Sequence, residues 1–72
     1  MADPIEVGER VEVFLNSRKF RREGWYPGMV FRIDPYSDHR CFYWVRLDEE
    51  SSALLGIREI SILNPKYIRK SG

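Results

Sequence analysis

Residues 40–48 are Arg-Cys-Phe-Tyr-Trp-Val-Arg-Leu-Asp, and their side chains alternate with the period of a β-strand. One set consists of Cys41, Tyr43, Val45 and Leu47, and the opposite set consists of Phe42, Trp44 and Arg46. Both sets are partly apolar, which suits a strongly curved sheet that is covered on more than one side. We therefore predict a strand here, within a sheet of several strands.

An earlier stretch has the same period. Residues 10–15, Arg-Val-Glu-Val-Phe-Leu, predict a half-buried strand with Phe14 on its outer side. The inner side chains of this strand are Val11, Val13 and Leu15. Residues 16–24 then carry four basic groups in five positions and end in Gly, so we expect a long polar connection.

Residues 25–33 predict the next strand, whose early Pro27-Gly28 suits a strand start, an edge or a bulge. One face of this strand is expected to carry Met29, Phe31 and Ile33. The segment Asp34-Pro35-Tyr36-Ser37-Asp38 predicts a turn, because Pro fixes its backbone dihedral and Asp and Ser side chains bond to the local backbone.

The last third of the chain predicts shorter elements. Asp48-Glu49-Glu50-Ser51-Ser52 is expected to form a polar loop, and Asn64-Pro65-Lys66 a single tight helical turn before a last strand at 67–70. The expected buried positions between them are Leu55, Ile57, Ile60 and Ile62. Strands at this spacing predict an all-β fold, a small five-stranded barrel with a short 3-10 turn before the last strand. We expect one domain over residues 1–72.

Size and charge narrow the function. The chain has 72 residues, with 12 Lys and Arg against 11 Asp and Glu, and a net charge of +1. A chain this short hides only about 60% of its surface on folding, which leaves little room for a deep catalytic cleft. We predict a domain that is not an enzyme and has no cofactor. The near-zero net charge indicates that any basic binding surface is local.

Few residues could bind a metal or form a disulfide. The single Cys41 excludes an internal disulfide and is typical of a reducing compartment. His39 and Cys41 are the two typical zinc ligands of the chain, whereas a structural zinc needs four, so we predict no metal site. No apolar run approaches the about 20 residues that span a bilayer, so no membrane partner is predicted.

Five short motifs resemble those of the Tudor and plant Agenet domains. They are Val7-Gly8-Glu9-Arg10-Val11-Glu12-Val13, Gly24-Trp25-Tyr26-Pro27-Gly28-Met29-Val30, Tyr43-Trp44-Val45-Arg46-Leu47-Asp48, Arg58-Glu59-Ile60-Ser61 and Pro65-Lys66-Tyr67-Ile68-Arg69. The resemblance covers residues 6–70, and the order of the motifs matters more than any one of them. These domains are SH3-like five-strand barrels of the chromatin-associated Royal superfamily. The resemblance therefore implies that fold, in a nuclear protein.

The resemblance also implies a pocket at one end of the barrel for a methylated lysine or arginine of a basic peptide, such as a histone tail. Aromatic faces attract such a cation by about 0.5–2 kcal/mol per contact. Tyr26 matches the aromatic residue of the family motif and is the first candidate for a wall. Trp25 is the second, because adjacent strand residues point to opposite faces and only one of the pair can easily face the core. Phe14 or Phe20 would add a wall from the first loop.

The end of the strand at 40–48 departs from the family pattern. Cage-forming Tudor domains have aromatic residues there, whereas this chain has Arg46-Leu47-Asp48-Glu49-Glu50. We therefore expect a partial pocket with Asp48 and Glu49 as its charged rim. Agenet domains often occur in tandem, so the resemblance also implies that half of a composite site lies in another domain.

Two other functions are open at this point. The run at 18–22 alternates basic groups with an aromatic residue, so Arg18, Lys19, Arg21 and Arg22 could bind phosphates while Phe20 and an exposed Trp25 stack on bases. The chain could also be a structural interaction domain, whose aromatic face is covered by another part of the parent protein or by a second copy. Each feature has a plainer explanation too, since aromatic residues of small barrels are usually core and charge runs are usually solvated.

Overall fold

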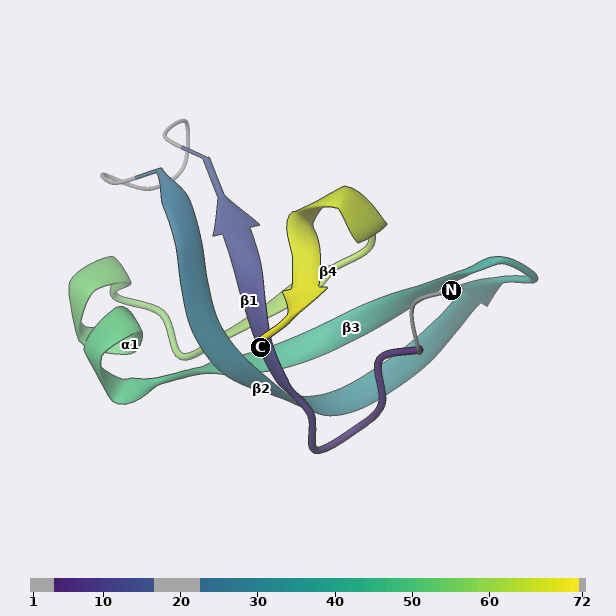
Figure 1. The fold of residues 1–72 in the computed structure, drawn as a ribbon, viewed down its shortest axis with the longest axis horizontal. Helices are drawn as coiled ribbons and strands as arrows, with labels where there is room; N and C mark the ends of the chain where they lie inside the picture. The colour runs from purple at the N-terminus through teal and green to yellow at the C-terminus, as the bar shows by residue number, and fades with distance from the viewer. Residues whose placement is uncertain (1–3, 17–22, 72) are drawn as a thin grey trace.

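The computed structural model describes residues 4–16 and 23–71, which form an antiparallel sheet with one short helix (Figure 1). The elements are β1 (Arg10–Leu15), β2 (Gly24–Ser37), β3 (Arg40–Leu47), α1 (Glu49–Leu55), β4 (Glu59–Ile62), the 3-10 turn η1 (Pro65–Tyr67) and β5 (Ile68–Lys70). The strands form a single sheet of order β4-β3-β2-β1-β5. The all-β class and the short 3-10 turn before the last strand are therefore confirmed.

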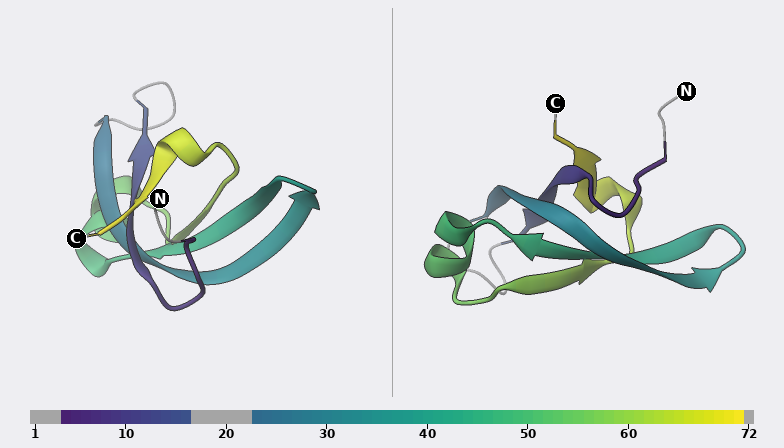
Figure 2. Two further views of the ribbon diagram at one scale, coloured as in Figure 1. Left: turned by 45° about the vertical axis from the view of Figure 1, so that its right-hand side comes forward. Right: turned by 90° about the horizontal axis from the view of Figure 1, so that it is seen from below.

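The long β2 gives the sheet its shape. Its first half pairs with β1, from Leu15 opposite Gly24 to Arg10 opposite Met29, and its second half pairs only with β3. Figures 1 and 2 show β2 and β3 running together to one end of the molecule, while α1 lies at the other end. β5 returns to pair with β1, which leaves β4 and β5 as the two edges. Among the described residues the curled sheet is not closed into a barrel.

The core is small and mostly aliphatic. Its buried side chains are Val11, Val13, Leu15, Tyr26, Val30, Val45, Leu47, Ile62 and Ile68. Partly buried side chains that pack against them are Ile5, Ile33, Tyr43, Leu55, Ile57 and Ile60. The alternation predicted for β1 and β3 is confirmed, because the expected inner set of β1 is buried and the inner set of β3 supplies Val45 and Leu47.

The prediction that Met29, Phe31 and Ile33 share one face of β2 is wrong. Tyr26, Gly28 and Val30 face the core, and Met29 is exposed on the other side. A β-bulge between Val30 and Arg32 then shifts the register by one residue, so that Ile33 packs against the core. A bulge reverses the alternation, and the sequence pattern of 25–33 merges two opposite phases.

The predicted turn at residues 34–38 is also wrong, because β2 continues to Ser37. Proline lacks a backbone N–H and is normally confined to edges or bulges of a sheet. β1 pairs with β2 only as far as Met29, so Pro35 lies where β2 has β3 as its one neighbour, next to a second register shift between Pro35 and Ser37. The missing N–H of Pro35 therefore costs β2 no hydrogen bond to a second neighbouring strand.

The predicted polar loop at 48–52 is instead the start of α1. Glu49 and Glu50 lie in its first turn, where negative charge interacts favourably with the helix dipole. Gly56 ends the helix in the left-handed conformation, with φ of 75°, and its N–H donates to the carbonyl oxygen of Ser52 at 2.8 Å. The acidic run is thus a helix start rather than a flexible turn.

Candidate cation-binding site

Three aromatic rings gather on the outer face of the sheet. Phe14 of β1 lies directly opposite Trp25 of β2, and their rings make an edge-to-face contact with centroids 5.5 Å apart. Tyr67 of η1 stacks on the other side of Phe14 at 6.0 Å and is 44% exposed. We call Phe14, Trp25 and Tyr67 the aromatic cluster.

Strand alternation explains why these rings face outward. Val13 and Leu15 are buried, so Phe14 between them points to the opposite face. Tyr26 is only 9% exposed and packs in the core, so its neighbour Trp25 also points outward. The burial of Val13, Leu15 and Tyr26 therefore determines that Phe14 and Trp25 lie on the outer face.

The turn that carries Tyr67 is held by a local cap. The side chain of Asn64 accepts a hydrogen bond from the backbone N–H of Lys66 at 2.9 Å. Pro65 follows at the first position of the turn, where its missing N–H is not needed. Tyr67 is then placed beside Phe14 because β5, which starts at the next residue, pairs with β1.

A cation of the chain itself already lies on this cluster. The guanidinium carbon of Arg69 is 3.9 Å from the centroid of the Trp25 ring. Its Nε donates to Oε1 of Glu12 at 2.9 Å, and Glu12 lies directly opposite Arg69 in the pairing of β1 with β5. The site therefore combines an aromatic face and a carboxylate around one positive charge, which is the chemistry of a cation-binding site.

The structure separates the predicted site residues. Phe14 and Trp25 are in contact on the outer face, whereas Tyr26 lies on the opposite face, in the core. Phe20 and the basic residues of 18–22 lie outside the described residues. Tyr67 and Arg69 were missed, although both belong to the motif Pro65-Lys66-Tyr67-Ile68-Arg69. Their part in the site follows from the pairing of β1 with β5, which no local pattern predicts.

The predicted acidic rim lies away from the aromatic cluster, at the start of α1. Asp48 accepts two hydrogen bonds from the guanidinium of Arg10, at 2.9 and 2.5 Å. These bonds lower the pKa of Asp48 and raise the pKa of Arg10. Arg10 precedes Phe14 by four positions on β1, a separation of about 13 Å along an extended strand. The charge of Asp48 is thus balanced by Arg10 rather than presented to the aromatic cluster.

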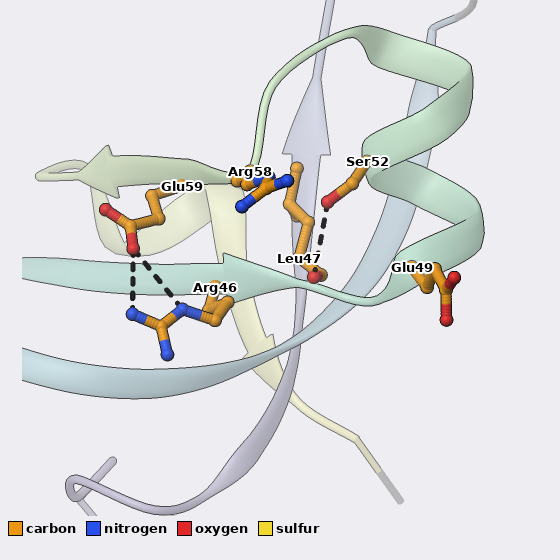
Figure 3. Close-up of a pocket in the computed structure, with 6 residues that line it drawn as sticks. All are labelled: Arg46, Leu47, Glu49, Ser52, Arg58 and Glu59. Carbon is orange, nitrogen blue, oxygen red and sulfur yellow. Dashed lines mark hydrogen bonds and ion pairs between the residues drawn. The ribbon is translucent and has the colours of Figure 1, made fainter.

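Glu49 lies on a different, polar cavity near α1 (Figure 3). The cavity has a volume of about 480 Å³ and is lined by Arg46, Leu47, Glu49, Ser52, Arg58 and Glu59. Arg46 pairs with Glu59 at 2.8 Å, and the hydroxyl of Ser52 donates to the carbonyl of Leu47 at 3.4 Å. Charges of both signs line this cavity and partly balance one another, so it offers no single ligand chemistry.

Cys41 and Tyr43 form a small polar pair on β3. A hydrogen bond with Cys41, together with burial, raises the pKa of Tyr43. His39 is exposed in the turn between β2 and β3. Within residues 4–16 and 23–71, no group of three or more His, Cys, Asp or Glu side chains could hold a metal ion.

Comparisons with protein-family models, with curated proteins and with solved structures found no match to this chain. In the part of the chain that the structure describes, no helix is long and apolar enough to cross a membrane.

Proposed function

We propose that this chain is a non-catalytic interaction module of a nuclear, chromatin-associated protein, which binds a basic peptide with a methylated lysine or arginine on the aromatic cluster. A histone tail is the expected partner. The observation that carries this proposal is the Arg69 guanidinium 3.9 Å from the Trp25 ring and 2.9 Å from Glu12. A surface that orders one cation of its own chain in this way has the chemistry to hold a similar cation of a partner.

We further propose that the sheet is an SH3-like barrel of the Tudor or Agenet type. The return of β5 to β1 supports this, because it curls a meander of four strands back on its first member. The bend of β2, whose two halves pair with different neighbours, acts in the same direction. NMR contacts between the two edge strands β4 and β5 would complete the assignment, because a barrel brings its edges together.

The energetics favour a weak, modification-sensitive interaction. Trp is the best aromatic partner for a cation, and each contact contributes about 0.5–1 kcal/mol when exposed and about 2 kcal/mol when desolvated. Methylation lowers the cost of removing the cation from water, because fewer N–H groups lose hydrogen bonds. If the contacts stay exposed, two or three rings give about 1–3 kcal/mol. This is only part of the about 4 kcal/mol that corresponds to a millimolar dissociation constant, so backbone contacts of the peptide must supply the rest.

An NMR titration with unmodified and methylated histone peptides tests the proposal. We expect the largest shifts at Phe14, Trp25 and Tyr67, and loss of binding in Trp25→Ala. The matched control is Tyr36→Ala, which removes another aromatic side chain, 62% exposed, on the part of β2 that pairs only with β3. Shifts spread over the sheet without the cluster, or equal loss in both variants, would contradict the proposal.

The salt dependence of binding separates a peptide from a nucleic acid. Neutralisation of four phosphates by the basic residues of 18–22 would give a log–log salt slope of about −3 to −4. A peptide held by aromatic contacts should respond far less. A single-stranded oligonucleotide that binds with the steep slope, while all peptides fail, would replace the proposed function.

A further inference from the structure

We propose that Arg69 is a built-in competitor: the site formed by Trp25 and Glu12 is a guanidinium site, and a partner arginine binds by taking the place of Arg69. This inference rests on the proposed function and names its ligand class. The arginine, methylated or not, must keep at least one N–H that can donate to Glu12.

The geometry of the site suits a guanidinium. Its planar group lies over the Trp25 ring at 3.9 Å, and Nε donates to Glu12 at 2.9 Å. A guanidinium stacks on an aromatic ring and still presents N–H groups at its edge. A trimethylated ammonium has no N–H, so it would contact Trp25 but leave the carboxylate of Glu12 without a hydrogen bond.

Arg69 can leave this site without unfolding the sheet. Its side chain is 54% exposed, and among the described residues it lies over the Trp25 ring and bonds to the carboxylate of Glu12. Exposed ion pairs and exposed cation–π contacts are both weak. The backbone of Arg69 stays in register opposite Glu12, so only the side chain must rotate.

Competition of this kind sets the size of the effect. The apparent dissociation constant equals the intrinsic constant divided by the fraction of molecules whose site is open. Two weak contacts keep Arg69 on the ring in most molecules, so its removal should tighten binding by about three- to tenfold. Removal of an arginine from another place on the sheet should leave the affinity for the peptide unchanged.

The chain offers a matched control for this test. Arg46 lies over the Phe31 ring at 4.9 Å and pairs with Glu59 at 2.8 Å, so it also combines a guanidinium, a ring and a carboxylate. Arg69→Ala and Arg46→Ala each remove one such guanidinium from the sheet. Thermal unfolding of both variants establishes that they are folded before binding is measured.

The experiment uses two peptides of identical sequence, one with arginine and one with trimethyl-lysine at the same position. We expect the arginine peptide to bind Arg69→Ala about three- to tenfold more tightly than the natural chain, and Arg46→Ala within about twofold of it. We expect the trimethyl-lysine peptide to bind more weakly than the arginine peptide throughout. In the natural chain, saturating arginine peptide should move the NMR signal of the Arg69 Nε–H away from its ring-shifted position.

Two results would overturn the inference and leave the proposed function intact. One is a trimethyl-lysine peptide that shifts the aromatic cluster and binds more tightly than the arginine peptide. The other is a saturated complex in which Arg69 keeps its ring-shifted signal and Arg69→Ala gains no affinity. If neither these peptides nor their methyl-arginine forms bind any folded variant, the proposed function fails with the inference.

Discussion

Gly28→Ala should destabilise the protein, because β2 lies so close to β3 at this residue that there is no room for a Cβ atom. A Cβ built on Gly28 would lie 2.7 Å from the carbonyl oxygen of Arg46 and 2.7 Å from a methyl carbon of Val45. Carbon atoms pack best at about 3.5–4.0 Å, so both contacts are strong overlaps. Arg46 lies on the central strand β3, between β2 and β4, so its carbonyl cannot withdraw without moving the sheet.

The net effect follows from two opposing contributions. Overpacking of a close-packed interior costs about 1–3 kcal/mol. Replacement of Gly by Ala reduces the entropy of the unfolded chain, which returns about 0.4–1 kcal/mol. We therefore expect a loss of about 1–2 kcal/mol in the free energy of unfolding, or a fall in Tm of about 4–16 °C at 4–8 °C per kcal/mol.

Urea and thermal unfolding followed by circular dichroism would measure this loss. The control is Gly56→Asn at the end of α1, where φ is +75° and no atom lies within 4 Å of the built Cβ. Asn tolerates the left-handed conformation, so this variant should lose only a few tenths of a kcal/mol. If Gly28→Ala is as stable as the natural chain while Gly56→Asn is less stable, β2 and β3 do not approach each other closely enough at Gly28 to exclude a Cβ.

Three further predictions concern titration and capping. The pKa of Asp48 is lowered by its hydrogen bonds with Arg10, so the pair stabilises the fold above the ordinary value of 3.8 and this contribution is lost as the pH falls below it; Asp48→Asn should flatten the pH dependence of Tm in that acid range. The pKa of Tyr43 is raised above 10.0 by the hydrogen bond with Cys41, so its contribution is present below pH 10.0 and is lost as the pH rises; Cys41→Ala should let Tyr43 ionise at lower pH, measured by absorbance near 295 nm. Asn64→Ala removes the cap of η1 and should lower the free energy of unfolding by about 1 kcal/mol in a urea titration, whereas Asn64→Asp should restore it.

The predictable parts of the fold are those in which buried and exposed side chains alternate without interruption. The alternation of 10–15 reports directly which side chains are buried, because the strand has no bulge. β2 was not predictable in this way, since the bulge between Val30 and Arg32 joins two phases of alternation. Pro35 indicated a turn because a local pattern cannot show that this part of β2 has one neighbour.

The site was only half predictable, for a related reason. Alternation placed Phe14 on the outer side, and Trp25 was a candidate because only one of Trp25 and Tyr26 can easily face the core. Tyr26, the first candidate, is the one that the core takes. The pairing of β1 with β5 adds Arg69 across 57 positions of sequence, through its bond to Glu12. Asp48 was expected on the rim, but its bond to Arg10 spans 38 positions and holds it elsewhere. Long-range pairing, rather than residue type, decides which charges meet which rings.

The most deeply buried side chains of the core are small. The side chains with essentially no exposure are Val11, Val13, Val30 and Val45. β2 and β3 approach closely at Gly28, and Trp25 lies on the outer face because its neighbour Tyr26 takes the core position. The rings of Trp25 and Phe31 are half-buried, and apolar surface that stays exposed favours aggregation. Arg69 lies over the Trp25 ring and Arg46 over the Phe31 ring, so each covers part of that surface.

Two roles of Arg69, shielding of the Trp25 ring and competition with a partner arginine, predict different results for Arg69→Ala. If Arg69 only shields Trp25, the variant should lose solubility and stability and gain no affinity for any cation. If the ring is a binding surface, the variant should lose about 0.6–1.4 kcal/mol of stability, the free energy of a three- to tenfold change, and gain affinity for arginine. The contact that protects the ring in the free protein is then the same contact that the partner arginine must replace. A stronger contact between Arg69 and Trp25 therefore means a lower affinity for the partner.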